Sequence, residues 1–243
     1  MAPRETIKDV NDLLEMLDGW FRPSLPFWDA FYANRERPAP FFADKPDENL
    51  VAYLENGWIP KTGRAADLGC GPGRNALYLA RAGFETEGFD LSEVAIRWAE
   101  ERAAKAGGRI RFECRSALDL TAREGYELVY DSGCMHTLLP HRRIRYIRTI
   151  VEALVPGGHF GFTCFAPGYG DVGGPEFAMT DWDVYRERSM NGGLAFTEEK
   201  IRYLLEDSFE CVELRPMLPQ APEADTFGVP FLWTSLWRKK RDA

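Results

Sequence analysis

The sequence predicts an α/β protein built on a doubly wound, mostly parallel sheet. From Arg64 onward, apolar runs of strand length alternate with amphipathic helical runs. Such alternation is typical of parallel strands joined by right-handed crossovers. A glycine-rich turn, Gly69 to Gly73, links the first of these strands to the first helix, where backbone amides and the helix dipole face a ligand.

The elements of the sheet follow from hydrophobic period and from stop signals. Strands are expected at Arg64 to Leu68, Phe84 to Phe89, Arg109 to Cys114, Tyr126 to Tyr130 and His159 to Phe165. Helices are expected at Ala76 to Ala82, from Ser92 as N-cap through Ala106 to a stop at Gly107-Gly108, and from Pro140 to Leu154. After a glycine-rich segment, Gly168 to Gly174, the pattern predicts helices at Trp182 to Ser189 and Thr197 to Leu205, then strands at Phe209 to Leu214 and Phe231 to Trp237.

Three helices are expected before the sheet, at Val10 to Leu17 with Gly19 as its stop, at Phe27 to Glu36, and at Pro46 to Asn56. The chain of 243 residues fits one domain, 1–243. We interpret residues 1–60 as a helical cap segment, and residues 61–243 as the core with an insertion at about 166–196.

Composition restricts the partners of the chain. A net charge of −8 repels phosphate backbones and argues against general nucleic-acid affinity, so a small-molecule substrate is expected. The start Met1-Ala-Pro-Arg-Glu lacks a signal-peptide pattern, and no apolar run approaches the roughly 20 residues of a membrane span. A cytoplasmic protein is therefore expected. The five cysteines are widely spaced without a Cys-x-x-Cys pair, which predicts neither a disulfide framework nor a metal site.

The glycine loop discriminates between cofactors. Asp90 ends the second strand, where an acid accepts hydrogen bonds from ribose hydroxyls. A dinucleotide fingerprint needs a small residue where this chain has Arg74, so a nicotinamide oxidoreductase is the weaker reading. Asp67 precedes the loop and matches the ammonium group of a methionine moiety, which favours S-adenosylmethionine.

These motifs resemble those of class I S-adenosylmethionine-dependent methyltransferases. Asp67-Leu-Gly-Cys-Gly-Pro-Gly followed by Phe89-Asp-Leu-Ser looks like the family's first two motifs, and Pro156-Gly-Gly-His-Phe looks like the turn before its fifth strand. Tyr130-Asp-Ser-Gly-Cys-Met-His and the run from Leu91 to Ala103 are similar to the thiopurine and tellurite-resistance branch, which methylates soft nucleophiles on small molecules. The resemblance implies a Rossmann-like, seven-stranded sheet whose last strand is antiparallel. The aromatic residues of the N-terminal helices predict a helical lid over the cofactor, with a patch packed on the sheet as the alternative.

The resemblance also implies a set of cofactor contacts. Asp67, Gly69, Gly71 and Asn75 would surround the methionine portion, Asp90 and Leu91 the ribose, and Ser116 and Ala117 the adenine, with Asp131 at the end of the fourth strand as a further cofactor and catalytic candidate. Ser116 stands where many family members have an acid, so adenine contacts from the Ala117 backbone or from Asp119 remain an alternative.

The acceptor is expected beyond the carboxyl ends of the fourth and fifth strands, where open α/β sheets bind ligands. His136 lies there and is the candidate general base, with a purely structural hydrogen-bonding role as the alternative. Trp28, Tyr32 and Tyr185 are candidate lid or substrate residues, because a sulfonium is attracted to aromatic faces. Trp182 is expected in the core, and His141 in solvent. On the arginine-rich helix, Ile144, Ile147 and Val151 are expected to be buried.

The leading hypothesis is therefore methyl transfer to a small molecule, with S-adenosylhomocysteine as product. A thiol acceptor is favoured, because a few per cent of an ordinary thiol is already ionised at neutral pH. The alternatives are an O- or N-methyltransferase of small natural products and a non-catalytic S-adenosylmethionine-binding regulator.

Overall fold

The computed structural model describes residues 6–106, 110–120 and 125–241. Three expectations fall outside these residues: the leader pattern Met1 to Glu5, the helix stop Gly107-Gly108, and the start of the third strand at Arg109. The described residues form the expected seven-stranded sheet, in the order β3-β2-β1-β4-β5-β7-β6. The strands are β1 (Gly63–Leu68), β2 (Phe84–Asp90), β3 (Ile110–Cys114), β4 (Tyr126–Ser132), β5 (Leu154–Phe165), β6 (Phe209–Pro216) and β7 (Leu232–Lys239).

Strand direction in the sheet confirms the doubly wound, Rossmann-like topology. The pairs formed by β1, β2, β3, β4 and β5 are all parallel. The last strand, β7, lies between β5 and β6 and is antiparallel to both. The chain order reverses at β1 and β4, so the ends of these two strands open a crevice at the switch point.

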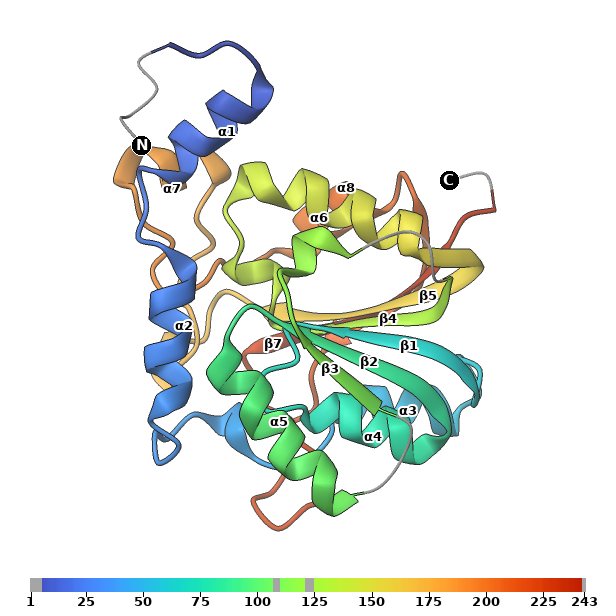
Figure 1. The fold of residues 1–243 in the computed structure, drawn as a ribbon. Helices are drawn as coiled ribbons and strands as arrows, with labels where there is room; N and C mark the ends of the chain where they lie inside the picture. The colour runs from blue at the N-terminus through green and yellow to red at the C-terminus, as the bar shows by residue number, and fades with distance from the viewer. Residues whose placement is uncertain (1–5, 107–109, 121–124, 242–243) are drawn as a thin grey trace.

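Helices cover both faces of the sheet (Figure 1). One face carries α3 (Glu48–Glu55), α4 (Arg74–Ala82) and α5 (Glu93–Ala106), and the other carries α6 (Pro140–Ala153) and α8 (Glu198–Leu205). Because both faces are covered, the central strands are apolar in successive residues, and Leu128, Val129 and Tyr130 are all inaccessible to solvent.

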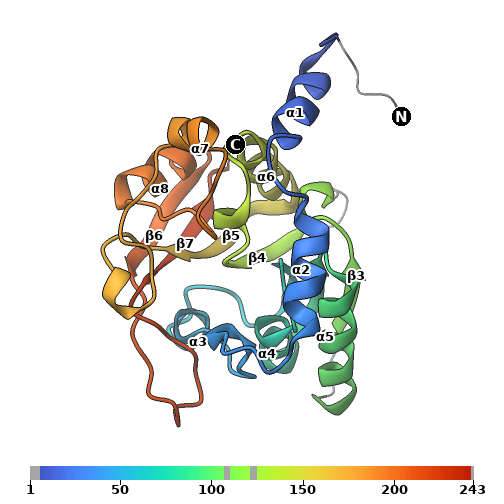
Figure 2. The same cartoon turned by 90° about the vertical axis from the view of Figure 1, so that its left-hand side faces the viewer.

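The remaining helices, α1 (Val10–Asp18), α2 (Ser24–Ala33) and α7 (Asp181–Glu187), gather at one end of the sheet (Figure 1). Figure 2 looks onto this end and shows α2 crossing it beside α5. The α2 helix begins three residues before the expected start at Phe27, because Pro26 falls in its first turn, where a missing amide hydrogen costs little. The α1 helix projects from the body, and its apolar residues Val10, Leu13 and Met16 are exposed rather than packed.

The α6 helix corrects one expectation about burial. Ile144 is 76% exposed, whereas Arg143, Tyr146 and Ile150 face the core. The cause is the Arg143 guanidinium, which pairs with Asp181 at 3.2 Å and lies over a buried aromatic ring of the core. Because Arg143 has these partners, it can face the core although it is charged. The hydrophobic pattern alone assigns that inward position to Ile144.

Two single-residue expectations are also wrong. Trp182 is 75% exposed on α7 instead of packing in the core. His141 is enclosed rather than solvated, because its Nε2 lies 2.8 Å from Asp18 and its Nδ1 lies 2.8 Å from the Tyr185 hydroxyl. These contacts join α1, α6 and α7. None of the helices in the described residues is long and apolar enough to cross a membrane.

Candidate active site

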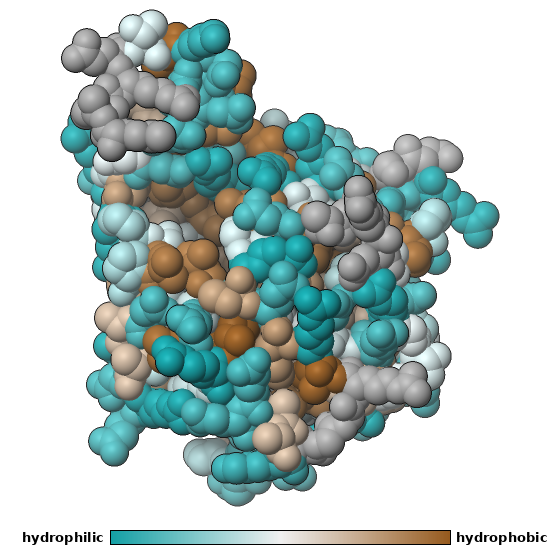
Figure 3. All heavy atoms as spheres, in the orientation of Figure 1, coloured by the Kyte–Doolittle hydropathy of each residue, from teal (hydrophilic) through white to brown (hydrophobic). Residues whose placement is uncertain are grey.

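A cavity of about 640 Å³ opens at the carboxyl ends of the parallel strands. Its floor is formed by residues that follow β1, β2, β4 and β5, and its walls by α2 and by the segment between β6 and β7. Figure 3 shows the surface hollowed between α1 and α2, with hydrophobic residues inside. The cavity lies where the sheet topology predicts a ligand.

The turn after β1 requires its glycines. Gly69, Gly71 and Gly73 have φ angles of +65°, +52° and +80°, which side chains rarely adopt. A Cβ on Gly69 would lie 2.7 Å from the Cβ of Cys134, and one on Gly71 would lie 3.0 Å from the Tyr32 hydroxyl oxygen. Both Gly69 and Gly71 line the cavity, so a ligand can touch the loop backbone directly.

Two buried carboxylates line the cavity beside this loop. Asp90 accepts hydrogen bonds from the amides of Gly71 (2.9 Å) and Ser92 (2.8 Å), and Asp67 accepts from the amide of Ala76 (3.0 Å). Burial raises the pKa of Asp67 to about 8 and that of Asp90 to about 6. Desolvated carboxyls of this kind favour a cationic ligand, which would restore their ionised form. The residues present therefore fit the ammonium and ribose groups of S-adenosylmethionine.

The other expected cofactor residues also line the cavity, but they differ in whether their side chains are already hydrogen-bonded within the protein. Leu91, Ser116 and Ala117 all border it. The Ser116 hydroxyl accepts from the Leu118 amide at 3.2 Å and so caps a short helical turn. The Asn75 amide group is engaged with Asp47, whose Oδ2 lies 3.0 Å from the Asn75 nitrogen. Asn75 therefore positions a protein segment and has little left to offer a ligand.

The structure does not place Asp131 on the cavity. Its carboxylate is fully buried and accepts from the amides of Cys134 (2.6 Å) and Met135 (2.9 Å) and from the Tyr146 hydroxyl (2.7 Å). These partners use its acceptor capacity and fix the turn that follows β4. Asp131 thus positions the residues that do line the cavity, in place of the direct role expected from the sequence.

His136 lines the cavity as expected, but its surroundings do not suit a base. The ring is 6% exposed and stacks on Phe165 with centroids 4.1 Å apart. Its Nδ1 accepts a hydrogen bond from the Phe165 amide at 3.2 Å. Burial lowers the pKa of the imidazole to about 3, so the ring is neutral at physiological pH and holds a further proton poorly.

Aromatic side chains from the two ends of the chain form one wall of the cavity, which we call the ring wall. It consists of Trp28, Phe31, Tyr32, Phe41, Phe227 and Phe231. Trp28 stacks on Tyr32 with centroids 5.8 Å apart, so these two expected lid residues do border the cavity. Tyr185, the third, is not among the lining residues, and its hydroxyl is bonded to His141 at the start of α6.

A buried arginine that the sequence pattern does not reveal joins the glycine loop to the ring wall. Arg74 is 7% exposed, lines the cavity and forms an ion pair of 2.6 Å with the fully buried Asp47. It also donates to the Ser132 hydroxyl at 2.9 Å and lies over the Phe227 ring. The sequence shows Arg74 only as a residue too large for a dinucleotide fingerprint, because Asp47 and Phe227 are far from it along the chain.

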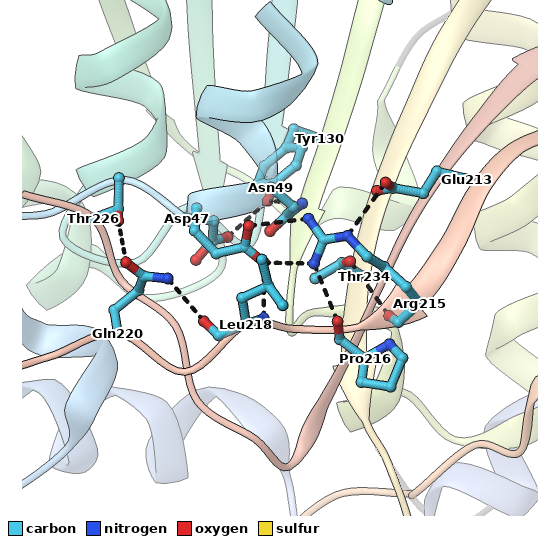
Figure 4. Close-up of polar contacts among 11 residues, drawn as sticks. Asp47, Asn49, Tyr130, Glu213, Arg215, Pro216, Leu218, Gln220, Thr226 and Thr234 are labelled. Carbon is cyan, nitrogen blue, oxygen red and sulfur yellow. Dashed lines mark hydrogen bonds and ion pairs between the residues drawn. The ribbon is translucent and has the colours of Figure 1, made fainter. Parts of the chain in front are cut away.

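A polar network fixes the segment between β6 and β7 that carries Phe227 (Figure 4). Glu48 accepts from the Arg215 guanidinium at 2.7 and 3.0 Å and from the Leu218 amide at 2.9 Å. Asp47 forms an isolated parallel bridge with Phe227. The ring wall is therefore fastened to the N-terminal residues that begin α3.

Comparison with known proteins identifies the fold and its domain. Residues 65–158 match a family model described as a methyltransferase domain. This stretch is thus similar to a methyltransferase domain, and solved methyltransferase structures share the fold of the chain. The match covers β1 to the start of β5 and includes the glycine loop and both cavity carboxylates. It confirms S-adenosylmethionine as the cofactor and sets aside the nicotinamide reading.

Several relatives of this methyltransferase domain are known. A 2-heptyl-1-hydroxyquinolin-4(1H)-one methyltransferase of Mycobacteroides abscessus is 29% identical over 143 residues, which are 56% of this chain and 61% of that protein. A solved structure described as "Conversion of a Disulfide Bond into a Thioacetal Group during Echinomycin Biosynthesis" is 25% identical, covers 91% of this chain and 94% of its own, and has a TM-score of 0.69.

A second solved structure shows the same fold with ligands. It is the 1,6-didemethyltoxoflavin-N1-methyltransferase of Burkholderia thailandensis with its substrate and S-adenosylhomocysteine, at 22% identity, 98% coverage of this chain, 93% of its own and a TM-score of 0.58. The chain spans 51% to 61% of the length of the first curated relatives that it matches.

Proposed function

We propose that this methyltransferase transfers the methyl group of S-adenosylmethionine to a nucleophile on a small, flat molecule. The observation that carries the proposal is the continuous cavity of about 640 Å³ that extends from Asp67 and Asp90 to the ring wall. Its size lies within the range of small-molecule sites, and its aromatic wall suits a planar ring.

Residues of the chain bind and orient the reactants in this proposal. Asp67, Asp90 and the backbone of the glycine loop would hold the cofactor, which supplies an electrophilic methyl group on a sulfonium. The ring wall would align the acceptor and exclude water, and these effects are the main sources of catalysis in a direct displacement. The bond from the nucleophile to the methyl carbon forms while the bond from that carbon to sulfur breaks.

Within this class we place a thiol or another soft nucleophile first. A thiol ionises near neutral pH and needs no strong protein base, which agrees with the low pKa of His136. The resemblance to the thiopurine and tellurite-resistance branch, and a structural neighbour whose description concerns disulfide and thioacetal chemistry, support sulfur. Oxygen or nitrogen acceptors are the second candidate, because two of the proteins described above are named for a hydroxyquinolone and for an N1 position.

A panel of small acceptors tests the proposal. Aromatic thiols, hydroxyheteroaromatics and heteroaromatic amines would be incubated with S-adenosylmethionine, and S-adenosylhomocysteine release measured beside cofactor affinity by calorimetry. We expect turnover with at least one aromatic class and the highest kcat/KM for a thiol. Tight cofactor binding without turnover of any acceptor would contradict the proposal and favour a non-catalytic regulator. Turnover confined to hydroxyls or amines would overturn the choice of sulfur alone.

A further inference from the structure

The two ring nitrogens of His136 have different surroundings. Nδ1 accepts a hydrogen bond from the Phe165 amide, so it presents a lone pair and carries no proton. The neutral ring must then carry its proton on Nε2. No described residue forms a hydrogen bond with Nε2, and the ring lines the cavity. The cavity therefore meets a hydrogen-bond donor and not a free lone pair.

Packing holds the ring in this orientation. A Cβ on Gly133 would lie 3.3 Å from the ring Cε1, and one on Gly193 would lie 3.2 Å from Cδ2. Phe165 stacks on the face of the ring, and the Leu194 amide donates to the carbonyl of His136 at 2.8 Å. A flipped ring would place a carbon against the Phe165 amide and leave that buried donor unpaired. The tautomer is thus set by the fold.

No charged group among the described residues raises the pKa of the His136 ring. Among the described residues, burial is the sole cause of the lowered pKa of His136. Of the carboxylates that line the cavity, Asp67 and Asp90 lie beside the glycine loop, and Asp18 is paired with Arg142 and His141. The Asp131 carboxylate is engaged with backbone amides. The thiol of Cys134, in the same turn, has its pKa raised by burial, so it stays protonated and has no thiolate that could take up a proton.

We propose that His136 donates a hydrogen bond from Nε2 to an acceptor atom adjacent to the nucleophile, and that the enzyme selects acceptors that arrive already ionised. This inference rests on the proposed function. The chemical class that fits is a heteroaromatic thiol with a ring nitrogen beside the sulfur, or an acidic heteroaromatic hydroxyl beside a carbonyl. The acceptor loses its proton to solvent before binding. The anion then forms the new bond to the methyl carbon, with no proton transfer inside the cavity.

Two variants of His136 separate a donor from a base. His136→Gln keeps an amide N–H that can donate into the cavity and an oxygen that can accept from the Phe165 amide, but glutamine takes up no proton at neutral pH. His136→Ala removes both functions. Their kcat/KM values would be measured by S-adenosylhomocysteine release with heteroaromatic thiols of graded pKa. Cofactor affinity and circular dichroism serve as controls for folding.

For a donor, we expect His136→Gln to stay within about threefold of the wild type and His136→Ala to lose roughly tenfold, the effect of one hydrogen bond. The loss should fall mainly on KM and should be equal across the series. The acidic limb of the wild-type pH profile should follow the pKa of each thiol. The proposal is overturned if glutamine is as damaging as alanine and both losses shrink for the more acidic thiols, because that pattern identifies a base.

Nitrogen NMR of the histidine rings provides a readout that does not depend on turnover. The protein contains three histidines, and the signals of His136 are those that disappear in His136→Gln. We expect a neutral ring with its proton on Nε2 that does not titrate between about pH 5 and 8. Titration near neutrality, or a proton on Nδ1, would refute the donor role even if no acceptor is found. Failure of the whole panel with the expected NMR result would instead count against the proposed function.

Discussion

The two halves of the cavity are built in different ways. The half around Asp67 and Asp90 uses backbone, buried carboxylates and glycines drawn from neighbouring strand ends, within one short stretch of chain. The ring wall uses side chains from α2, Phe41 shortly after it, and side chains from the segment between β6 and β7, which is nearly two hundred residues further along the sequence. The first half is thus a local property of strand–turn–helix geometry, while the second exists only in the folded molecule.

The sharpest test of this division removes one half. Deleting residues 1–44 takes away Trp28, Phe31, Tyr32 and Phe41 but leaves every strand of the sheet, so we expect turnover to be abolished. S-adenosylhomocysteine release measures the effect, and circular dichroism reports on the sheet. Deleting residues 1–17 is the matched control, because it removes most of α1 and keeps the ring wall; that variant should remain active. A stable 45–243 fragment with unchanged kinetics would show that the ring wall is dispensable.

Arg74 is the residue that connects the two halves, and breaking its ion pair should have the largest effect of any single substitution. Arg74→Met leaves the carboxylate of Asp47 buried without a counter-charge, which should lower the free energy of unfolding by about 3–5 kcal/mol in urea titrations. Adding Asp47→Asn to Arg74→Met should restore part of the loss. A decrease below about 1 kcal/mol for the single variant would mean that water reaches the pair.

Asp90 tests the loop half alone. Asp90→Ala should weaken S-adenosylmethionine binding by about 1.5 kcal/mol, the loss of charge-assisted hydrogen bonds to the ribose. Calorimetry would also show wild-type affinity falling as the pH drops through about 6, because the Asp90 carboxyl then takes up a proton. Asp90→Asn keeps the side-chain volume and should remove that contribution to the pH dependence. Equal affinity of wild type and Asp90→Ala would assign the ribose to another residue.

Substitution of Glu48 tests whether its hydrogen bonds hold the ring wall in place, and this substitution has the smallest expected effect. Glu48→Gln weakens the bonds to Arg215 and Leu218, and we expect KM for the acceptor to rise roughly three- to fivefold while cofactor affinity is unchanged. The exposed pair between Arg238 and Glu210 provides the control, and Glu210→Gln should change neither quantity. A change in cofactor affinity with Glu48→Gln would mean that the two halves are not independent.

The sequence predicts well what depends on local pattern. The alternation from Arg64 predicts the parallel, doubly wound sheet, and the glycine loop with Asp67 and Asp90 is predicted at the end of the first two strands, where it does line the cavity. The local sequence pattern does not predict which charged side chains are buried. Arg74 and Arg143 turn inward because Asp47 and Asp181, remote along the chain, stand opposite them.

The predicted roles of Asp131 and Tyr185 fail for a related reason. Position at the end of a strand, or on an aromatic helix face, does not reveal which partners a side chain already has. The Asp131 carboxylate is occupied by the turn after β4, and the Tyr185 hydroxyl by His141. For His136 the place in the fold is predicted correctly, while the tautomer depends on a backbone amide in the next strand.

The bridge between Asp47 and Phe227 has a consequence for synthesis on the ribosome. The residues proposed to bind the cofactor are translated early, whereas Phe227 and Phe231 emerge long after them and are followed by β7, which joins β6 to the rest of the described sheet. Until then the edge of β5 is unpaired and its apolar residues need shielding from other nascent chains. The proposed acceptor site therefore forms only after the segment between β6 and β7 has left the ribosome.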